Sequence, residues 1–352
     1  MIFERILLDC FQNIQAERSS SSIYHLLKGK RSIQTVQDAH IYSLDPYYGI
    51  YKNISKGYYD KKIQELVKGD LLEKVDEKEM THNISHQGLV WKNNQSYSLF
   101  FKGLLYYDKT DVFIGRLLLL VQTLTNSKMN FYSFIPVVNN PQIELWVRNM
   151  FRQVKGSESV ILQKIYSELK LCLFQLTEKE ANIFVDRLTG YQSYGMSLFQ
   201  LAKEYEMTVD DIHLILISII HRILNTLEVN STKFPVLSTM VDNQSSLSQI
   251  TNSASETYKY FLNGLTVEQI SNVRRLKINT IYDHLVEIAL YDDQFPIDQY
   301  VNVEEQNEIL CAVKRAHSHR LKDIKELVKN EISYFQIRLV LAVMNKQKIG
   351  GN

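Results

Sequence analysis

The sequence predicts a mainly α-helical protein of several domains that ends in a helix-turn-helix bundle. Apolar residues recur at helical spacing along most of the 352 residues, and only five prolines interrupt them. One long polar run, rich in serine, asparagine and glutamine, separates the last quarter from the rest. A chain of this length has room for two or three hydrophobic cores. We therefore expect an N-terminal domain over 1–100, a central domain over 101–228, a flexible linker over 229–254 and a C-terminal domain over 255–346.

The N-terminal segment reads as helices followed by short strands. An amphipathic helix over 1–16 places Ile2, Phe3 and Ile6 on one face. Three helices followed by a hairpin is the order of a winged helix, and a plain helical domain with irregular connections is the alternative. The expected pieces are two short helices on either side of the basic turn at 28–31, a helix from Ser55 to about Lys68, a strand over 71–75 and a strand pair over 89–91 and 97–100.

The central segment contains a first stretch with helix-turn-helix character. Helices are expected near 110–126, 141–154 and 158–173, and the stretch 176–227 then resembles the helix-turn-helix of sigma-factor-like proteins. Its third helix begins with Asp210 and Asp211 and continues with apolar residues on several sides. An acidic start repels phosphates, and a helix that is apolar all round is usually buried. We therefore predict a packing or protein-docking element here, with DNA contact as the alternative.

The linker over 229–254 and the C-terminal stretch over 255–291 are distinguished by their composition. The linker has little to bury, which predicts a flexible segment that lets the last domain move separately.

In the C-terminal stretch, Asn263-Gly264 ends an opening helix, and Thr266 begins a short second helix with Gln269 as its capping-box partner. A third helix starts near Asn279, and its expected buried face is formed by Ile281, Leu285 and Ile288.

The turn before this third helix is basic, and the helix begins with polar side chains. A recognition helix needs this layout, because cations at the turn hold phosphate while short polar side chains near the helix start reach base edges. The alternative is a solvated turn on a bundle that binds protein. The candidate DNA-binding residues are Arg274, Arg275, Lys277, Asn279, Thr280, Tyr282 and His284.

Residues 255–341 also resemble a known module. The matching pieces are LTVEQI at 265–270, Asn279-Thr280-Ile281 and the closing Ile332-Ser333-Tyr334. They are similar to the helix-turn-helix domain at the C-terminus of some bacterial RecQ-type helicases. The whole chain resembles the YpbB family, free-standing bacterial proteins that carry this module without a helicase. One departure is Ser271, where the module commonly has alanine. Because the family's gene is typically found beside a RecQ-like helicase gene, the resemblance implies such a helicase as a partner.

Enzymatic and metal-binding roles find no support in the sequence. Gly29-Lys30 fails as a phosphate-binding loop, because Tyr24 stands where the first glycine is required and Arg31 replaces the metal-binding hydroxyl. The three cysteines are far apart, and His317 with His319 lacks further ligands at metal spacing. No nucleophile–base arrangement can be assembled either. We therefore expect a protein that is not an enzyme and that uses no metal and no cofactor.

The remaining composition indicates a cytoplasmic protein with local rather than global attraction to DNA. The formal net charge is +1, so any DNA contact must come from local clusters of basic residues. The N-terminus lacks the features of a signal peptide, and the apolar runs at 113–121 and 212–220 are too short to span a membrane. Its cysteine usage fits a reducing cytosol. No small-molecule substrate is expected.

The function predicted from these observations is that of a DNA-binding accessory protein. It would act in trans with a RecQ-like helicase in replication or repair, with its C-terminal helix-turn-helix gripping DNA. Two alternatives remain. A transcription regulator would read a specific operator as a dimer, because one helix-turn-helix reads few bases. A protein-interaction scaffold would bind the helicase and make no contact with DNA.

Overall fold

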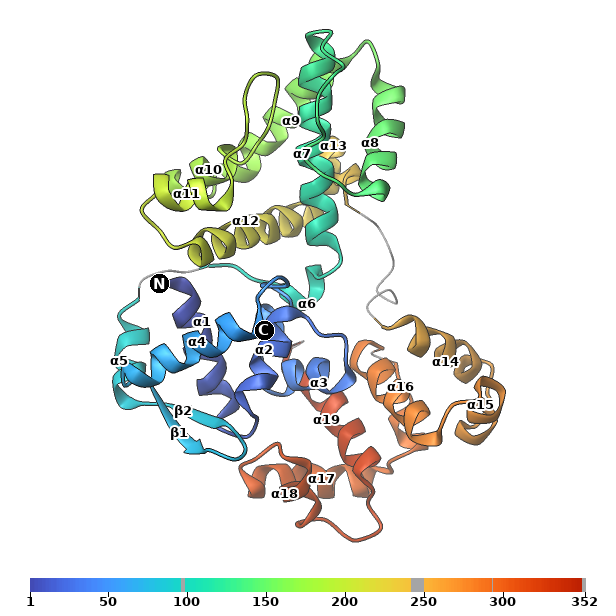
Figure 1. The fold of residues 1–352 in the computed structure, drawn as a ribbon. Helices are drawn as coiled ribbons and strands as arrows, with labels where there is room; N and C mark the ends of the chain where they lie inside the picture. The colour runs from blue at the N-terminus through green and yellow to red at the C-terminus, as the bar shows by residue number, and fades with distance from the viewer. Residues whose placement is uncertain (96–98, 242–249, 293, 350–352) are drawn as a thin grey trace. The chain divides into compact units, whose positions relative to one another are not determined.

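The computed structural model describes residues 1–95, 99–241, 250–292 and 294–349. Helices form nearly all of the described secondary structure, with one two-stranded hairpin, which confirms the mainly α fold class (Figure 1). By its internal contacts the chain divides into two compact units. The first unit comprises Met1–Ile6 and Asn93–Asn243, and the second comprises Leu7–Lys92 and Gln244–Asn352. The division therefore differs from the four consecutive segments expected from the sequence.

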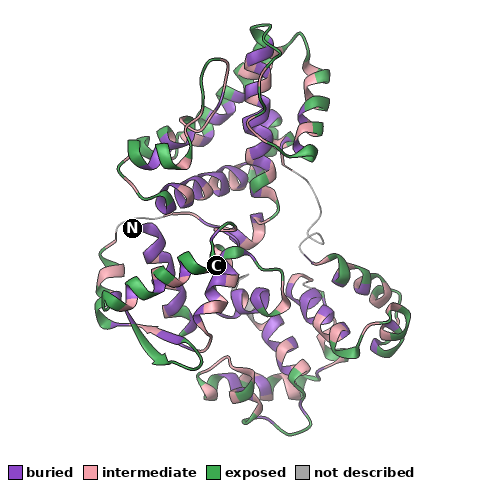
Figure 2. Cartoon of the chain, viewed as in Figure 1, coloured by how far each residue is buried: buried purple, intermediate pink, exposed green. Residues whose placement is uncertain are grey.

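The first unit is built around one long helix, α12 (Val209–Val229), which packs against α7, α9, α10, α11 and α13. Figure 2 shows that α12 is buried along most of its length. The other helices of the unit are α6 (Gly103–Tyr106), α7 (Lys109–Lys128), α8 (Pro141–Val154), α9 (Glu158–Leu173), α10 (Glu178–Val185), α11 (Leu198–Glu204) and α13 (Pro235–Thr239), with a 3-10 turn, η2, at Ser231–Lys233. By length and composition α12 could cross a membrane, which corrects the expectation that every apolar run is too short. Its burial within the unit is that of a core helix.

The acidic residues at the start of α12 stabilise the fold. Asp210 and Asp211 are both buried, and Asp211 Oδ1 accepts hydrogen bonds from the backbone N–H groups of Ile2 at 2.8 Å and Phe3 at 3.3 Å. These N–H groups lie in the first turn of α1 (Ile2–Ile14), where no intrahelical partner exists for them. The carboxylate therefore caps α1, and the start of α12 is a packing element.

The predicted linker over 229–254 is partly ordered. Residues 235–239 form α13, which packs on α9, and Val236 and Leu237 are buried there. Glu168 on α9 holds this helix, because its carboxylate accepts from the backbone N–H of Val236 at 3.1 Å and of Leu237 at 2.8 Å. Thr251 already caps the next helix, so both ends of the expected linker are structured. Its middle, 242–249, lies outside the described residues.

The N-terminal part of the second unit places four helices before the hairpin, and the last three of them with the hairpin have the order of a winged helix. After α1 come α2 (Ser20–Lys28), α3 (Ile33–Ile41), a 3-10 turn η1 (Asp45–Tyr47), α4 (Lys56–Lys68), β1 (Leu72–Asp76), β2 (Thr81–Ile84) and α5 (His86–Asn93). The strands are antiparallel, with Leu72 opposite Ile84 and Lys74 opposite His82. The predicted strand over 71–75 is confirmed as β1.

The predicted strand pair over 89–91 and 97–100 is wrong in its first member, which belongs to α5. Leu89, Val90 and Trp91 are favourable strand residues, but the preceding residues impose a helix start. Ser85 Oγ accepts from the backbone N–H of Gly88 at 2.8 Å and so caps α5. Residues 97 and 98 of the second member lie outside the described residues, and residues 99 and 100 are not in a strand.

The C-terminal part of the second unit holds the helix-turn-helix and a closing group of helices. Its elements are α14 (Asn252–Leu262), α15 (Val267–Arg274), α16 (Ile278–Tyr291), η4 (Ile297–Gln299), α17 (Val303–Ala316), α18 (Leu321–Lys325) and α19 (Tyr334–Ile349). Helix α16 is central, because it packs on α14, α15 and α19. Its predicted core residues Ile281, Leu285 and Ile288 are all buried.

The two parts of the second unit are packed together, although about 150 residues separate them in the chain. Helix α3 contacts both α16 and α19. Gln37 on α3 donates to the Arg338 carbonyl at 3.0 Å, and Arg338 Nε donates back to Gln37 Oε1 at 3.2 Å. Glu17 accepts from the backbone N–H of His319 at 2.9 Å. These contacts place the C-terminal helices in one compact unit with residues 7–92. Contacts so distant in sequence leave no trace in local composition.

Candidate nucleic-acid interface

Local sequence signals fix the three helices of the C-terminal helix-turn-helix. Asn263 is the C-cap of α14, and Gly264 after it has a positive φ of 79° that a side chain would strain. Thr266 and Gln269 form the predicted capping box: Thr266 Oγ1 accepts from the Gln269 N–H, and Gln269 Oε1 accepts from the Thr266 N–H. The chain then turns at Arg275, which adopts the left-handed conformation with φ 52°. The first two features form the connection between α14 and α15, and the turn at Arg275 connects α15 to α16.

Four of the seven predicted DNA-binding residues lie at the outer start of α16. Arg275, Lys277 and Asn279 are exposed, and Thr280 is half-buried. Lys277 is the N-cap residue, no side chain caps the helix, and the first turn contains no acidic residue. The uncapped N–H groups and the positive end of the helix dipole favour an anion at this position. The start of α16 can therefore bind phosphate and present Asn279 to a base edge.

Arg274 is directed into the module and holds α14 to α15. Its guanidinium donates to the Ser253 carbonyl at 2.7 Å and forms an ion pair of 2.8 Å with Glu256. It also donates to Thr257 Oγ1 at 2.5 Å. Only 9% of the side chain is exposed. The guanidinium of Arg274 is thus engaged in contacts within the module. It does not face outward, so the phosphate-binding role predicted for it is not supported.

His284 is directed inward as well. The ring is buried, and its Nδ1 lies 2.7 Å from Thr257 Oγ1, in the same polar cluster as Arg274. Burial lowers the pKa of His284, the positive charge of Arg274 lowers it further, and Asp283 acts in the opposite direction. A neutral, buried imidazole that bonds a threonine serves to orient α14 on α16.

Tyr282 lies half-buried on the side of α16 that faces α19. Its ring stacks on Phe335, with 4.1 Å between ring centroids. The neighbouring Asp283 accepts from Arg338 at 2.6 Å, so Arg338 has the structural ion-pair role expected of it. Stacking on Phe335 fixes the Tyr282 ring beside the start of α16 and leaves part of it accessible.

With this geometry established, comparisons with known proteins show what the chain is similar to. Residues 253–341 match a family described as a helix-turn-helix domain. Over 350 residues, the sequence is 28% identical to Protein YpbB of Bacillus subtilis strain 168, with 98% of each chain covered. The resemblance to the YpbB family is confirmed. No solved structure matches the chain. The helix-turn-helix match supports DNA as a binding partner of this chain.

One residue at the start of α16 was absent from the predicted set. Ile278 is 41% exposed, beside Lys277 and Asn279. An exposed aliphatic side chain on a recognition helix can contact a thymine methyl group. No sequence signal distinguished it, because Ile281 and Leu285 follow Ile278 at i+3 and i+7, a spacing that predicts the same buried face.

Other basic residues near the helix-turn-helix have structural partners. Arg320 donates to the Ala16 carbonyl at 2.7 Å and to the Glu17 carbonyl at 3.2 Å. Lys325 donates to three backbone carbonyls between Lys329 and Ile332. A separate basic group, Lys28, Lys30 and Lys56, surrounds His25, whose pKa is lowered first by burial and then by these three charges.

Proposed function

We propose that this protein binds DNA through the start of α16 and acts in trans with a RecQ-like helicase. One observation carries the DNA part: Arg275, Lys277 and Asn279 are all exposed around a helix N-terminus that no side chain caps. Phosphate at this end would meet two cations and the positive end of the helix dipole. The corresponding end of α12 is acidic and buried, so the two helix-turn-helix-like segments have different tasks.

The helicase part rests on the resemblance to the YpbB family and to the C-terminal module of RecQ-type helicases. A helicase that lacks this module would gain a DNA grip from a partner that carries it. The protein would then contribute binding rather than catalysis, and would work in the cytoplasm alongside replication or repair of DNA.

The test of DNA binding compares two pairs of basic residues in the same unit. Fluorescence anisotropy with forked and duplex DNA would be measured on the full chain, on Arg275→Ala/Lys277→Ala and on Lys314→Ala/Arg315→Ala. The control pair is exposed in the last turn of α17, so it removes the same charge elsewhere. Each lost phosphate contact should reduce the slope of log affinity against log salt by about 1. We expect a reduction of about 2 for the α16 pair and little change for the control pair.

The same measurements separate the alternatives. Equal losses in both double variants would mean that net charge, not the start of α16, drives binding. Strong preference for one duplex sequence together with a dimer would favour a transcription regulator. If the protein bound no DNA, the remaining alternative would be a protein-interaction scaffold that binds the helicase. The helicase part is tested by adding the protein to a RecQ-like helicase from the same bacterium, where stimulated unwinding is expected with the wild-type chain and not with the α16 variant.

A further inference from the structure

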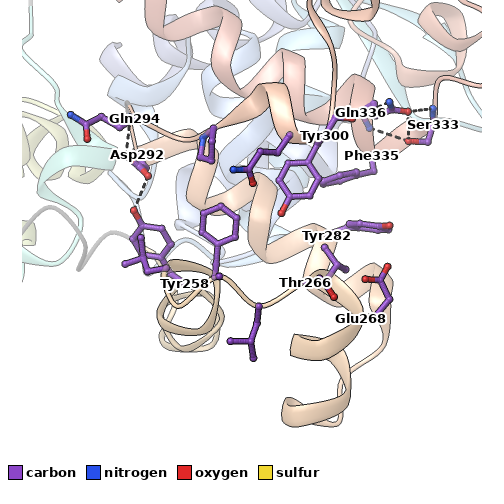
Figure 3. Close-up of a pocket in the computed structure, with 17 residues that line it drawn as sticks. Tyr258, Thr266, Glu268, Tyr282, Asp292, Gln294, Tyr300, Ser333, Phe335 and Gln336 are labelled. Carbon is purple, nitrogen blue, oxygen red and sulfur yellow. Dashed lines mark hydrogen bonds between the residues drawn. The ribbon is translucent and has the colours of Figure 1, made fainter.

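A wide groove lies on the C-terminal module beside the start of α16. It has a volume of about 910 Å³ and is lined by the end of α14, the start of α15, the segment after α16 and the start of α19 (Figure 3). Five of its lining residues are aromatic: Tyr258, Phe261, Tyr282, Tyr300 and Phe335. All five are half-buried, so each ring is held by neighbours and still has accessible surface.

The rings form a continuous series, which we call the aromatic row. The buried Phe295 links the two halves of the row, because its ring stacks on Phe261 at 5.5 Å and on Tyr300 at 6.1 Å between centroids. Tyr258 extends the row beyond Phe261, and Phe335 and Tyr282 extend it beyond Tyr300. Mutual packing fixes the ring orientations, so the apolar surface is preformed and little conformational entropy is lost when it is covered.

The charges around the row are negative. Glu268 and Asp292 line the groove, and no lysine or arginine is among its described lining residues. Asp292 is held in place, because its Oδ2 accepts from Tyr258 Oη at 2.7 Å and its Oδ1 accepts from the Gln294 N–H at 2.9 Å. Glu268 is exposed in the first turn of α15. A nucleic-acid backbone is disfavoured here, because its phosphates would meet two carboxylates without a compensating cation.

We propose that the aromatic row binds a basic, apolar segment of a partner protein, in which lysine or arginine side chains flank proline or aliphatic residues. Aliphatic and proline side chains cover ring faces, while cations are attracted both to the carboxylates and to the faces of tyrosine rings. The amide side chains of Gln294 and Gln299, at the edge of the groove, can bond to the backbone of such a segment. This binding is separate from the DNA contact, which uses cations on the neighbouring helix start.

The groove is tested on the full-length protein with a phage-displayed library of random linear peptides. We expect enrichment of peptides that combine lysine or arginine with proline or aliphatic residues. Enriched peptides would then be synthesised with a fluorescent label and titrated with the wild-type chain and with Glu268→Lys, Glu304→Lys and Tyr300→Ala. Glu304 is a matched control, since both glutamates are exposed and follow the first helical residue after a capping-box N-cap.

The expected result is a peptide affinity about tenfold lower for Glu268→Lys and for Tyr300→Ala, and unchanged for Glu304→Lys. Glu268 is on the surface, so its variant remains informative if Tyr300→Ala does not fold. Arg275→Ala/Lys277→Ala should keep peptide binding, which distinguishes this site from the DNA contact. The proposal is overturned if no basic, apolar motif is enriched, or if the peptides bind Glu268→Lys as they bind the wild type. The proposal is also overturned if Tyr300→Ala binds single-stranded oligothymidine more weakly than the wild type does but binds the peptides equally well.

Discussion

At the scale of single residues, Arg275 combines an unfavourable backbone conformation with an exposed charge. Its φ of 52° lies in the left-handed region, where residues other than glycine and asparagine are destabilised by about 1 kcal/mol or more. The turn between α15 and α16 would therefore be more stable with glycine. An arginine at this position lowers the stability of the turn, which is consistent with a residue that serves binding rather than folding.

Arg275→Gly should raise stability while it weakens DNA binding. Relief of the left-handed conformation predicts a free energy of unfolding about 1 kcal/mol above that of Arg275→Ala, which loses the same charge but keeps a β-carbon. Denaturant unfolding of both variants measures the difference, and anisotropy measures the loss of DNA affinity. If Arg275→Gly proved no more stable than Arg275→Ala, the conformational argument would be wrong.

His284 should make the C-terminal module less stable in mild acid. Burial and Arg274 lower its pKa below the usual 6.5, so the unfolded chain binds the proton more readily than the folded one. The free energy of unfolding should therefore fall as the pH drops below about 6.5 towards the folded-state pKa. Glu287, whose pKa burial raises, favours the folded state as it takes up a proton and gives the opposite slope.

The comparison that isolates His284 is between the wild type and His284→Gln. Thermal unfolding at about pH 7.5 and about pH 5.5 should show a larger acid-induced loss for the wild type, because Glu287 contributes equally to both proteins. Identical losses would show that the imidazole has the same pKa in the folded and the unfolded state.

At the scale of helices, the start of α12 distinguishes a packing element from a DNA reader. Asp211 is buried and caps the first turn of α1 through two backbone N–H groups. Asp211→Ala should lower the free energy of unfolding by about 2 kcal/mol, since it removes hydrogen bonds to a charged acceptor and leaves buried donors unsatisfied. DNA affinity should be unchanged. Glu206→Ala, on the exposed turn before α12, is the control, with an expected effect within about 0.5 kcal/mol.

Helix boundaries were predictable wherever the signal was local. The capping box at Thr266 and the stop at Gly264 depend on residues close in sequence, and both are present in the structure. Short apolar runs were ambiguous, because 89–91 suits a strand by composition and became a helix through the Ser85 cap. Over only three residues, the spacing of apolar side chains cannot distinguish a helix from a strand.

The candidate interface was predictable in position but not residue by residue. Arg274 and His284 have the right residue types and lie in the right stretch. Their inward direction is set by Thr257, which lies 17 and 27 residues away. Such contacts depend on how α14 packs, which no local pattern encodes. The aromatic row was hidden for the same reason, because its members come from four separate segments and individually resemble ordinary core residues.

At the scale of the whole molecule, the two ends of the chain depend on each other for their packing. Helix α3 contacts α16 and α19, and Gln37 bonds to Arg338. Fragments covering 1–92 and 251–349 should therefore associate when co-expressed, and each should melt at a lower temperature alone than together. Co-purification and thermal unfolding measure this. Arg320→Ala, which removes the bonds to the carbonyls of Ala16 and Glu17, should weaken the association. Fragments that fold equally well apart would show that these contacts are incidental.

The discontinuous second unit also has a consequence for synthesis on the ribosome. Residues 7–92 emerge early, but the helices that cover α3 belong to the last hundred residues. At about 5–20 residues per second, the nascent chain waits on the order of 10–50 s before α19 is available. During that time the side of α3 that packs on α16 and α19 has no native cover, whereas the first unit, apart from its opening residues, can form from continuous chain. The waiting N-terminal segment is therefore where we expect ribosome-associated chaperones to bind.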